Sequence, residues 1–232
     1  MPQTYLITGA SRGIGLEFAR QLSTRAASTG DTILATARDP AKATELNALK
    51  GVTMLTLDVA SEASIEGFTK ALASRPIDVL INNAGISNHM PDLASCTLAK
   101  LQDVFTTNTF APILLTKALL PNISAGAGKR IINITSVLGS MGLHHTGFSY
   151  GYCASKAALN MLTQKLATEL AKSHPTSCII ALHPGWVQTE MGGKEATLTP
   201  TAAVQTMLTT IAGLTPASTG AYLNTDGAVL PW

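Results

Sequence analysis

The sequence has few charged residues, few aromatic residues and few cysteines for a chain of 232 residues. Charged residues make up 13% and aromatic residues 5%, and the only cysteines are Cys96, Cys153 and Cys178. Three scattered cysteines do not form a disulfide framework and are typical of a reducing compartment. The net charge is +2 without a basic run, which argues against a nucleic-acid partner. We therefore expect a cytoplasmic protein.

Long apolar runs are also missing. No run approaches the length of a membrane span, and residues 4–7 enter a strand-like segment without the features of a signal peptide. We expect no membrane association. Apolar residues nevertheless make up 46%, which is typical of a parallel sheet buried on both faces. The length fits one domain over residues 1–232.

Strand and helix periodicities alternate from one end of the chain to the other. We expect strands at 3–8, 32–37, 52–57, 77–81, 130–134, 177–182 and 221–223. We expect helices at 14–27, 40–49, 61–73, 98–119, 152–173 and 200–212, with an interruption near Pro112 and an end before Pro121. This order predicts an α/β Rossmann fold with a seven-stranded, parallel, doubly wound sheet and helices on both faces. Ligands of such sheets bind beyond the carboxyl ends of the strands.

A glycine-rich turn joins the first strand to the first helix. The spacing of its glycines differs from Gly-x-Gly-x-x-Gly, but the physical requirements are the same: a tight turn, close backbone approach and a helix N-terminus that faces a pyrophosphate. The alternative is an ordinary strand-to-helix turn, which would hardly need three glycines. The predicted cofactor-binding residues of the turn are Gly9, Ser11, Arg12, Gly13, Ile14 and Gly15.

The end of the second strand predicts NADP(H) rather than NAD(H). An acidic residue there would bind the ribose 2′-hydroxyl, but Arg38 follows Ala37. Arg38 and Arg12 can flank a 2′-phosphate with their guanidinium groups. Asp39 is the competing ribose ligand, and we expect it to cap the helix that begins at Pro40 instead.

Two further strand ends are predicted to contact the nucleotide. Asp58 and Val59 follow the third strand and are expected near the adenine. Asn83, Ala84 and Gly85 follow the fourth strand, where small and amide residues allow the backbone to approach a ribose.

Tyr152 and Lys156 are four residues apart in a segment of good helix formers, so both side chains are expected on one face of a helix. A nearby ammonium lowers the pKa of a phenol, and general acid–base chemistry needs a pKa near the working pH. The spacing alone is a weak signal and also fits an accidental pair on an amphipathic face. Tyr150 has no lysine four residues later and is expected to be a packing or pocket residue.

Taken together, these motifs resemble the short-chain dehydrogenase/reductase family over essentially the whole chain, with local similarity to its carbonyl-reductase-like and cell-signal-factor-like members. The motifs that carry the resemblance are Thr8-Gly9-x-x-x-Gly13-x-Gly15, Asn82-Asn83-Ala84-Gly85, Asn108, Ser136, Tyr152-x-x-x-Lys156, Pro184-Gly185 and Thr189. The resemblance implies an NADP(H)-dependent oxidoreductase that transfers a hydride between the nicotinamide and a carbonyl or secondary alcohol.

The resemblance also implies roles for individual residues. Tyr152 is the general acid or base, and Lys156 lowers its pKa and binds the nicotinamide ribose. Ser136 polarises the substrate oxygen, and Asn108 holds a water that links Lys156 to solvent. Ser140 is a rival to Ser136, which we prefer because it directly follows a strand. The expected nicotinamide ligands are Pro184, Gly185, Val187 and Thr189.

The substrate, a small carbonyl or alcohol, is expected to lie between the loops 86–92, 137–151 and 186–198. Candidate pocket residues are Leu138, His144, His145, Trp186 and Met191. The histidine pair has no third ligand, so we expect no metal site. The family resemblance implies a homodimer or homotetramer built through the helices that contain Asn108 and Tyr152.

Two other functions remain open. The fold can serve a nucleotide-binding regulatory or signalling protein without turnover, although such a protein would be expected to lose the tyrosine or the lysine. It can also serve a non-redox lyase or dehydratase in which Tyr152 still moves a proton.

Overall fold

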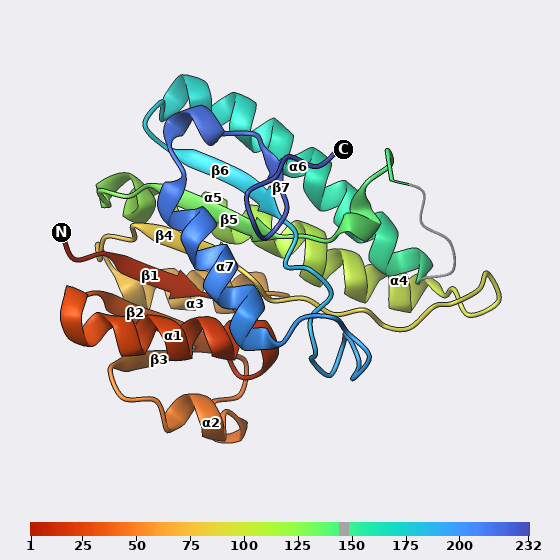
Figure 1. The fold of residues 1–232 in the computed structure, drawn as a ribbon, viewed down its shortest axis with the longest axis horizontal. Helices are drawn as coiled ribbons and strands as arrows, with labels where there is room; N and C mark the ends of the chain where they lie inside the picture. The colour runs from red at the N-terminus through yellow and green to blue at the C-terminus, as the bar shows by residue number, and fades with distance from the viewer. Residues whose placement is uncertain (144–148) are drawn as a thin grey trace.

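A computed structural model describes residues 1–143 and 149–232, and one parallel sheet runs through this part of the chain (Figure 1). The strand order β3-β2-β1-β4-β5-β6-β7 confirms the predicted Rossmann-type fold. The strands are β1 (Thr4–Ile7), β2 (Thr32–Ala37), β3 (Val52–Thr56), β4 (Val79–Asn82), β5 (Arg130–Ile134), β6 (Cys178–Leu182) and β7 (Tyr222–Leu223).

The helices lie between the strands, as the alternating periodicity predicts. They are α1 (Gly13–Thr29), α2 (Thr44–Asn47), α3 (Glu62–Leu72), α4 (Leu98–Phe105), α5 (Ala111–Ala125), α6 (Tyr150–Ser173) and α7 (Pro200–Gly213). Four short turns complete the description: 3₁₀ turns at η1 (Pro40–Lys42), η3 (Val137–Gly139) and η4 (Pro216–Ser218), and a π turn at η2 (Thr106–Phe110).

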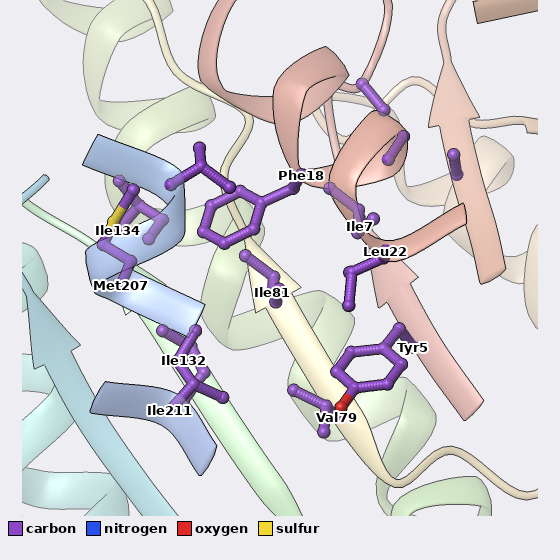
Figure 2. Packing of buried hydrophobic residues seen from close by; sticks show 14 of the residues in the cluster. Tyr5, Ile7, Phe18, Leu22, Val79, Ile81, Ile132, Ile134, Met207 and Ile211 are labelled. Atoms are coloured by element: carbon purple, nitrogen blue, oxygen red, sulfur yellow. The ribbon is translucent and has the colours of Figure 1, made fainter. Parts of the chain in front are cut away.

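Helices α1 and α7 cover one face of the sheet. Phe18 and Leu22 of α1 and Met207 of α7 pack with apolar side chains of the central strands, among them Ile7 and Ile81 (Figure 2). Helices α3, α5 and α6 cover the opposite face through a second apolar cluster. Burial on both faces explains why the strand sequences are almost uniformly apolar.

The chain reverses its direction of winding between β1 and β4, which are neighbours in the sheet but belong to opposite halves of the strand order. The loops that follow these two strands leave the same edge and are tied together by Thr8. Its hydroxyl oxygen accepts hydrogen bonds from the backbone N–H of Asn83 at 3.0 Å and of Ala84 at 3.1 Å. This is the edge at which open parallel sheets bind their ligands.

The predicted helix over 98–119 is three elements in the structure. The interruption is the π turn at 106–110, just before the expected position, and Pro112 lies in the first turn of α5, where no N–H is needed. Helix α5 continues through Pro121 to Ala125, so the predicted end before Pro121 is wrong. Pro121 has no N–H, so the carbonyl of Lys117 has no hydrogen-bond partner within the helix. Both residues are exposed, and water can bond to that carbonyl instead.

The start of the predicted helix 40–49 is confirmed in detail, but the helix is short. Asp39 caps it by accepting from the N–H of Ala41 at 3.1 Å, as predicted. The segment then divides into η1 and α2, separated by Ala43 with a non-helical ψ of 51°. Ser61 caps α3 by accepting from the N–H of Ser64 at 3.2 Å.

Within residues 1–143 and 149–232, none of the helices combines the length and the apolar character needed to span a bilayer.

Candidate active site

Three glycines shape the turn after β1. Gly9 has a φ of 65°, and a Cβ there would lie 2.8 Å from the Cα of Ala84. A Cβ on Gly15 would lie 2.4 Å from the carbonyl oxygen of Gly9. Gly13 also has a positive φ of 57°. The backbone therefore needs glycine at each position, which argues against an ordinary connection between strand and helix.

The N-terminus of α1 has the features of a phosphate-binding site. Arg12 at the N-cap forms no side-chain capping bond, and the first turn contains no acidic residue. The first backbone N–H groups of a helix have no intrahelical acceptors and carry a partial positive charge. Ser11 and Ile14 are partly buried in the same turn. These residues fit a dinucleotide pyrophosphate.

Two arginines lie where the 2′-phosphate was predicted. Arg38 is exposed just after β2 and forms no ion pair within the described residues. Arg12 pairs with Glu190 at 2.9 Å, and both side chains are 75% exposed. Asp39, the competing ribose ligand, caps the following turn and forms an ion pair with Lys42 at 3.3 Å.

The other predicted nucleotide residues lie on the same edge. Asp58 and Val59 follow β3 and are partly buried. The side-chain N–H₂ of Asn83 donates to the carbonyls of Thr8 at 2.9 Å and Gly9 at 3.2 Å, so it holds the glycine turn. A Cβ on Gly85 would lie 3.3 Å from Oδ1 of Asn108 and 3.8 Å from Nζ of Lys156.

Lys156 lies on α6 and is only 4% exposed. Its Nζ donates to the carbonyl oxygen of Ile134, the last residue of β5, at 2.8 Å. Burial lowers the pKa of Lys156 to about 8, because a charged ammonium loses hydration inside the protein. The lysine therefore changes charge close to neutral pH.

Tyr152 lies one turn before Lys156 on the same helix, as predicted, and Nζ of Lys156 is 5.7 Å from the centroid of its ring. The predicted lowering of the phenol pKa is not found. Burial raises the pKa of Tyr152 to about 12, and the hydrogen bond with Ser136 opposes this rise. The sequence shows the spacing of the two residues but not the burial, which is the largest cause of the rise in the Tyr152 pKa.

Asn108 lies in the π turn η2 and is fully buried. Its Oδ1 accepts from the N–H of Ile86 at 2.9 Å, and its Nδ2 donates to the carbonyl of Ile86 at 2.8 Å and to the hydroxyl of Ser155 at 3.0 Å. Pro112 has no N–H to give to the Asn108 carbonyl, which interrupts the regular ladder at this residue. Asn108 thus connects the loop after β4 to the helix that carries Tyr152 and Lys156.

Ser136 and Ser140 have different surroundings. Ser136 follows β5 and contacts the phenol of Tyr152 through its hydroxyl, which also accepts from the N–H of Leu138 at 3.2 Å. The Ser140 hydroxyl donates to the carbonyl of Pro231 at 2.6 Å and accepts from the N–H of Leu143. The geometry therefore favours Ser136, the residue preferred from the sequence.

The loop after β6 approaches the glycine turn. A Cβ on Gly13 would lie 3.4 Å from Cγ2 of Thr189, and Val187 is buried. Pro184 is buried, and Gly185 has a φ of 80°. Trp186 is 52% exposed and donates from Nε1 to the carbonyl of Gly192 at 2.8 Å, so it belongs to its own loop rather than to an enclosed apolar wall.

The structure does not bring all of the remaining pocket candidates together. Leu138 is partly buried beside Ser136, and Met191 is 46% exposed. His144 and His145 lie outside the described residues. Met90 in the loop 86–92 is fully buried and packs on Gly151, so this loop contributes to the core as well as to the site. Tyr150, expected to be a packing or pocket residue, is 53% exposed at the start of α6, which argues against packing and leaves the pocket role open.

Within the described residues there is no group of three or more metal-ligating side chains. A cavity of about 440 Å³ lies at the opposite, amino-terminal edge of the sheet, between residues 1–3, Arg130 and residues 214–216. It is remote from Tyr152 and does not belong to the candidate site.

Sequence reasoning missed Thr8, Ser155 and Tyr222 as residues that support the site. Thr8 joins the two loops at the switch point, and Ser155 joins Asn108 to α6. The phenol of Tyr222 donates to the carbonyl oxygen of Ser136 at 2.8 Å. Thr8 could have been found from its place directly after β1, but Tyr222 is 86 residues from Ser136 and no local pattern marks it.

Comparison with known proteins agrees with this geometry. Residues 3–198 match the family model described as short chain dehydrogenase, so the chain belongs to the short-chain dehydrogenase family. It is 39% identical over 169 residues to C-signal of Myxococcus xanthus, an alignment that covers 72% of this chain and 100% of that protein.

Two solved structures extend the similarity to the fold. The NADPH-bound carbonyl reductase from chicken fatty liver is 36% identical, with a TM-score of 0.90 and coverage of 100% of this chain and 99% of that one. The carbonyl reductase Sniffer of D. melanogaster is 30% identical, with a TM-score of 0.91 and full coverage of both chains. The chain is thus a short-chain dehydrogenase-type oxidoreductase that resembles carbonyl reductases.

Proposed function

We propose that this chain is an NADP(H)-dependent carbonyl reductase that transfers a hydride between the nicotinamide and a carbonyl or secondary alcohol. The observation that carries the proposal is the grouping of Ser136, Tyr152 and Lys156 at the sheet edge to which the glycine turn also belongs. The similarity to carbonyl reductases supports the same assignment.

The cofactor supplies the hydride when it is bound, and the chain supplies position and proton control. The turn formed by residues 9–15 holds the pyrophosphate, and Arg12 and Arg38 hold the 2′-phosphate. Asp58 and Val59 contact the adenine, and residues 83–85 lie along a ribose. Lys156 binds the nicotinamide ribose, and the nicotinamide itself is held by Pro184, Gly185, Val187 and Thr189.

In carbonyl reduction, two hydroxyl groups act on the substrate oxygen. The Ser136 hydroxyl donates to the substrate oxygen, and Tyr152 gives its proton to the same oxygen. A pKa of about 12 keeps the phenol of Tyr152 protonated at neutral pH. An alkoxide is a stronger base than a phenolate, so proton transfer from the neutral phenol to the product is favourable. In alcohol oxidation the phenolate of Tyr152 is the base that accepts the proton of the alcohol.

Lys156 and Asn108 restore the proton to Tyr152. With a pKa of about 8, Lys156 holds and releases a proton close to neutral pH. Asn108 holds a water next to the lysine and so links it to solvent. The buried contact between Asn108 and Ser155 at 3.0 Å keeps this arrangement fixed relative to α6.

The substrate loops are proposed to take a small carbonyl compound, with Leu138, Trp186 and Met191 as apolar contacts. Trp186 and Met191 are half exposed, which fits an open pocket with broad carbonyl tolerance. The similarity to C-signal favours, as a second candidate, a nucleotide-binding signalling protein of the same fold.

Turnover separates the carbonyl reductase from the signalling protein and from a dehydratase. We expect the protein to oxidise NADPH with members of a panel of ketones, aldehydes and quinones, and Tyr152→Phe to reduce kcat by at least about a hundredfold, because it removes the proton donor. Absorbance at 340 nm measures both. Unchanged turnover in Tyr152→Phe contradicts the role of the phenol. Binding of NADPH without consumption on any carbonyl favours the signalling protein, and consumption of a hydroxy compound without a redox change favours a dehydratase.

The preference for NADPH over NADH is expected to depend on Arg38. A hydrogen bond to a charged group contributes about 1.5–3 kcal/mol, so Arg38→Ala should weaken NADPH binding at least about tenfold and leave NADH binding unchanged. Lys42→Ala is the matched control, because it removes an exposed positive charge four residues away that already pairs with Asp39. Calorimetric titration with both nucleotides measures the effect. Equal loss in the two variants, or none in Arg38→Ala, contradicts a direct contact with the 2′-phosphate.

We also propose a homodimer or homotetramer built through α5 and α6. Three large apolar residues are exposed here: Phe110 (48%) on the π turn before α5, Leu114 (36%) on α5 and Met161 (59%) on α6. Burial of these side chains between two chains would favour association. Light scattering at micromolar concentration should give a mass of two or four chains. A monomer under these conditions contradicts the proposed assembly.

A further inference from the structure

A second buried tyrosine contacts Ser136 through the backbone carbonyl, whereas Tyr152 contacts the hydroxyl. Tyr222 belongs to β7, a strand of two residues at the edge of the sheet, and is fully buried. Its hydroxyl donates to the backbone carbonyl of Ser136 at 2.8 Å. The side chain of Asn160 on α6 also hydrogen-bonds to this phenol.

The Ser136 carbonyl is the point at which the backbone leaves β5 and enters the turn η3. The carbonyl accepts a second hydrogen bond, from the N–H of Gly139 at 2.8 Å. These two bonds fix the peptide plane that follows Ser136. Ser136 itself is extended, with φ of −158° and ψ of 145°, and its hydroxyl faces the phenol of Tyr152. The two bonds therefore restrain the backbone from which the Ser136 hydroxyl projects.

The segment 230–232 holds Tyr222 in place and reaches over to the loop after η3. The ring of Trp232 lies 5.1 Å from the ring of Tyr222, and the N–H of Leu230 donates to the Tyr222 carbonyl at 2.8 Å. On the other side, the Ser140 hydroxyl donates to Pro231 and the N–H of Gly142 donates to the Trp232 carbonyl at 2.8 Å. One segment thus joins β7 to the loop that follows Ser136.

We propose that Tyr222, supported by residues 230–232, is a positioning residue that aims the Ser136 hydroxyl at the substrate oxygen. The inference rests on the proposed function, because it assigns Tyr222 an effect on the carbonyl reduction performed there. Tyr222 touches neither substrate nor cofactor and acts through Ser136. This role would explain why the short strand β7, which has only two residues, lies next to β6.

Tyr5→Phe is the matched control for Tyr222→Phe. Tyr5 is also a buried tyrosine of the sheet, and its hydroxyl also forms hydrogen bonds, with Gln3 and Arg25. It lies on β1, away from Ser136. Both variants lose one buried phenolic hydroxyl, so a general loss of stability affects both alike.

The restraint on Ser136 is measured first by hydrogen exchange, which needs no turnover. In Tyr222→Phe the amides of Leu138 and Gly139, which bond to Ser136, should exchange at least about tenfold faster than in the wild type, because opening of this turn becomes easier. In Tyr5→Phe they should not change. Equal exchange of these amides in the two variants overturns the proposal, whether or not the protein is a reductase.

A double-mutant cycle then tests the catalytic consequence. Tyr222→Phe should lower kcat for carbonyl reduction about tenfold with an unchanged KM for NADPH, and it should have no further effect when Ser136 is already replaced by alanine. Effects that multiply in the double variant show that Tyr222 does not act through Ser136 and overturn the proposal. If the wild type reduces no carbonyl, the proposed function fails and the exchange experiment alone decides the role of Tyr222.

Discussion

The burial of one ammonium group is the constraint on which the candidate site depends. Nζ of Lys156 donates to the Ile134 carbonyl, and the residue is only 4% exposed. An ammonium in such a place is stabilised less than in water, so its pKa falls to about 8. The same low polarity raises the pKa of Tyr152 to about 12. Burial thus keeps the phenol of Tyr152, the proposed proton donor, protonated and brings the pKa of the neighbouring Lys156 near neutral pH.

The residues and loops around Lys156 support its buried ammonium group. A Cβ on Gly85 would crowd Oδ1 of Asn108 at 3.3 Å, and the π turn places Asn108 where it joins the loop after β4 to α6. The parallel order of the strands gathers these loops at one edge. The same edge carries the glycine turn, in which Gly9 and Gly15 permit backbone contacts that no larger residue allows. The proposed cofactor site and the proposed proton donor therefore lie at one edge of the same sheet.

Patterns that are local in the sequence predicted most of this arrangement. The parallel, doubly wound sheet follows from the alternation of periodicities, and the caps Asp39 and Ser61 follow from capping chemistry. The direction of the Tyr152 pKa shift could not be predicted, because burial depends on how distant segments pack. The contact of Tyr222 with Ser136 joins residues far apart in the chain and has no sequence signature. Pro121 was misjudged because its exposure, which makes it tolerable in α5, is a property of the folded helix.

The central claim is that Lys156 is buried strongly enough to change charge near neutral pH. It is tested most directly by NMR titration of protein labelled with ¹³C at the lysine ε-carbon, with the Lys156 signal assigned by its loss in Lys156→Met. The account predicts that this signal titrates with a pKa of about 8, well below the ordinary lysine value of 10.5. Titration of Lys156 at the ordinary value would show that its ammonium is hydrated, and it would contradict the account.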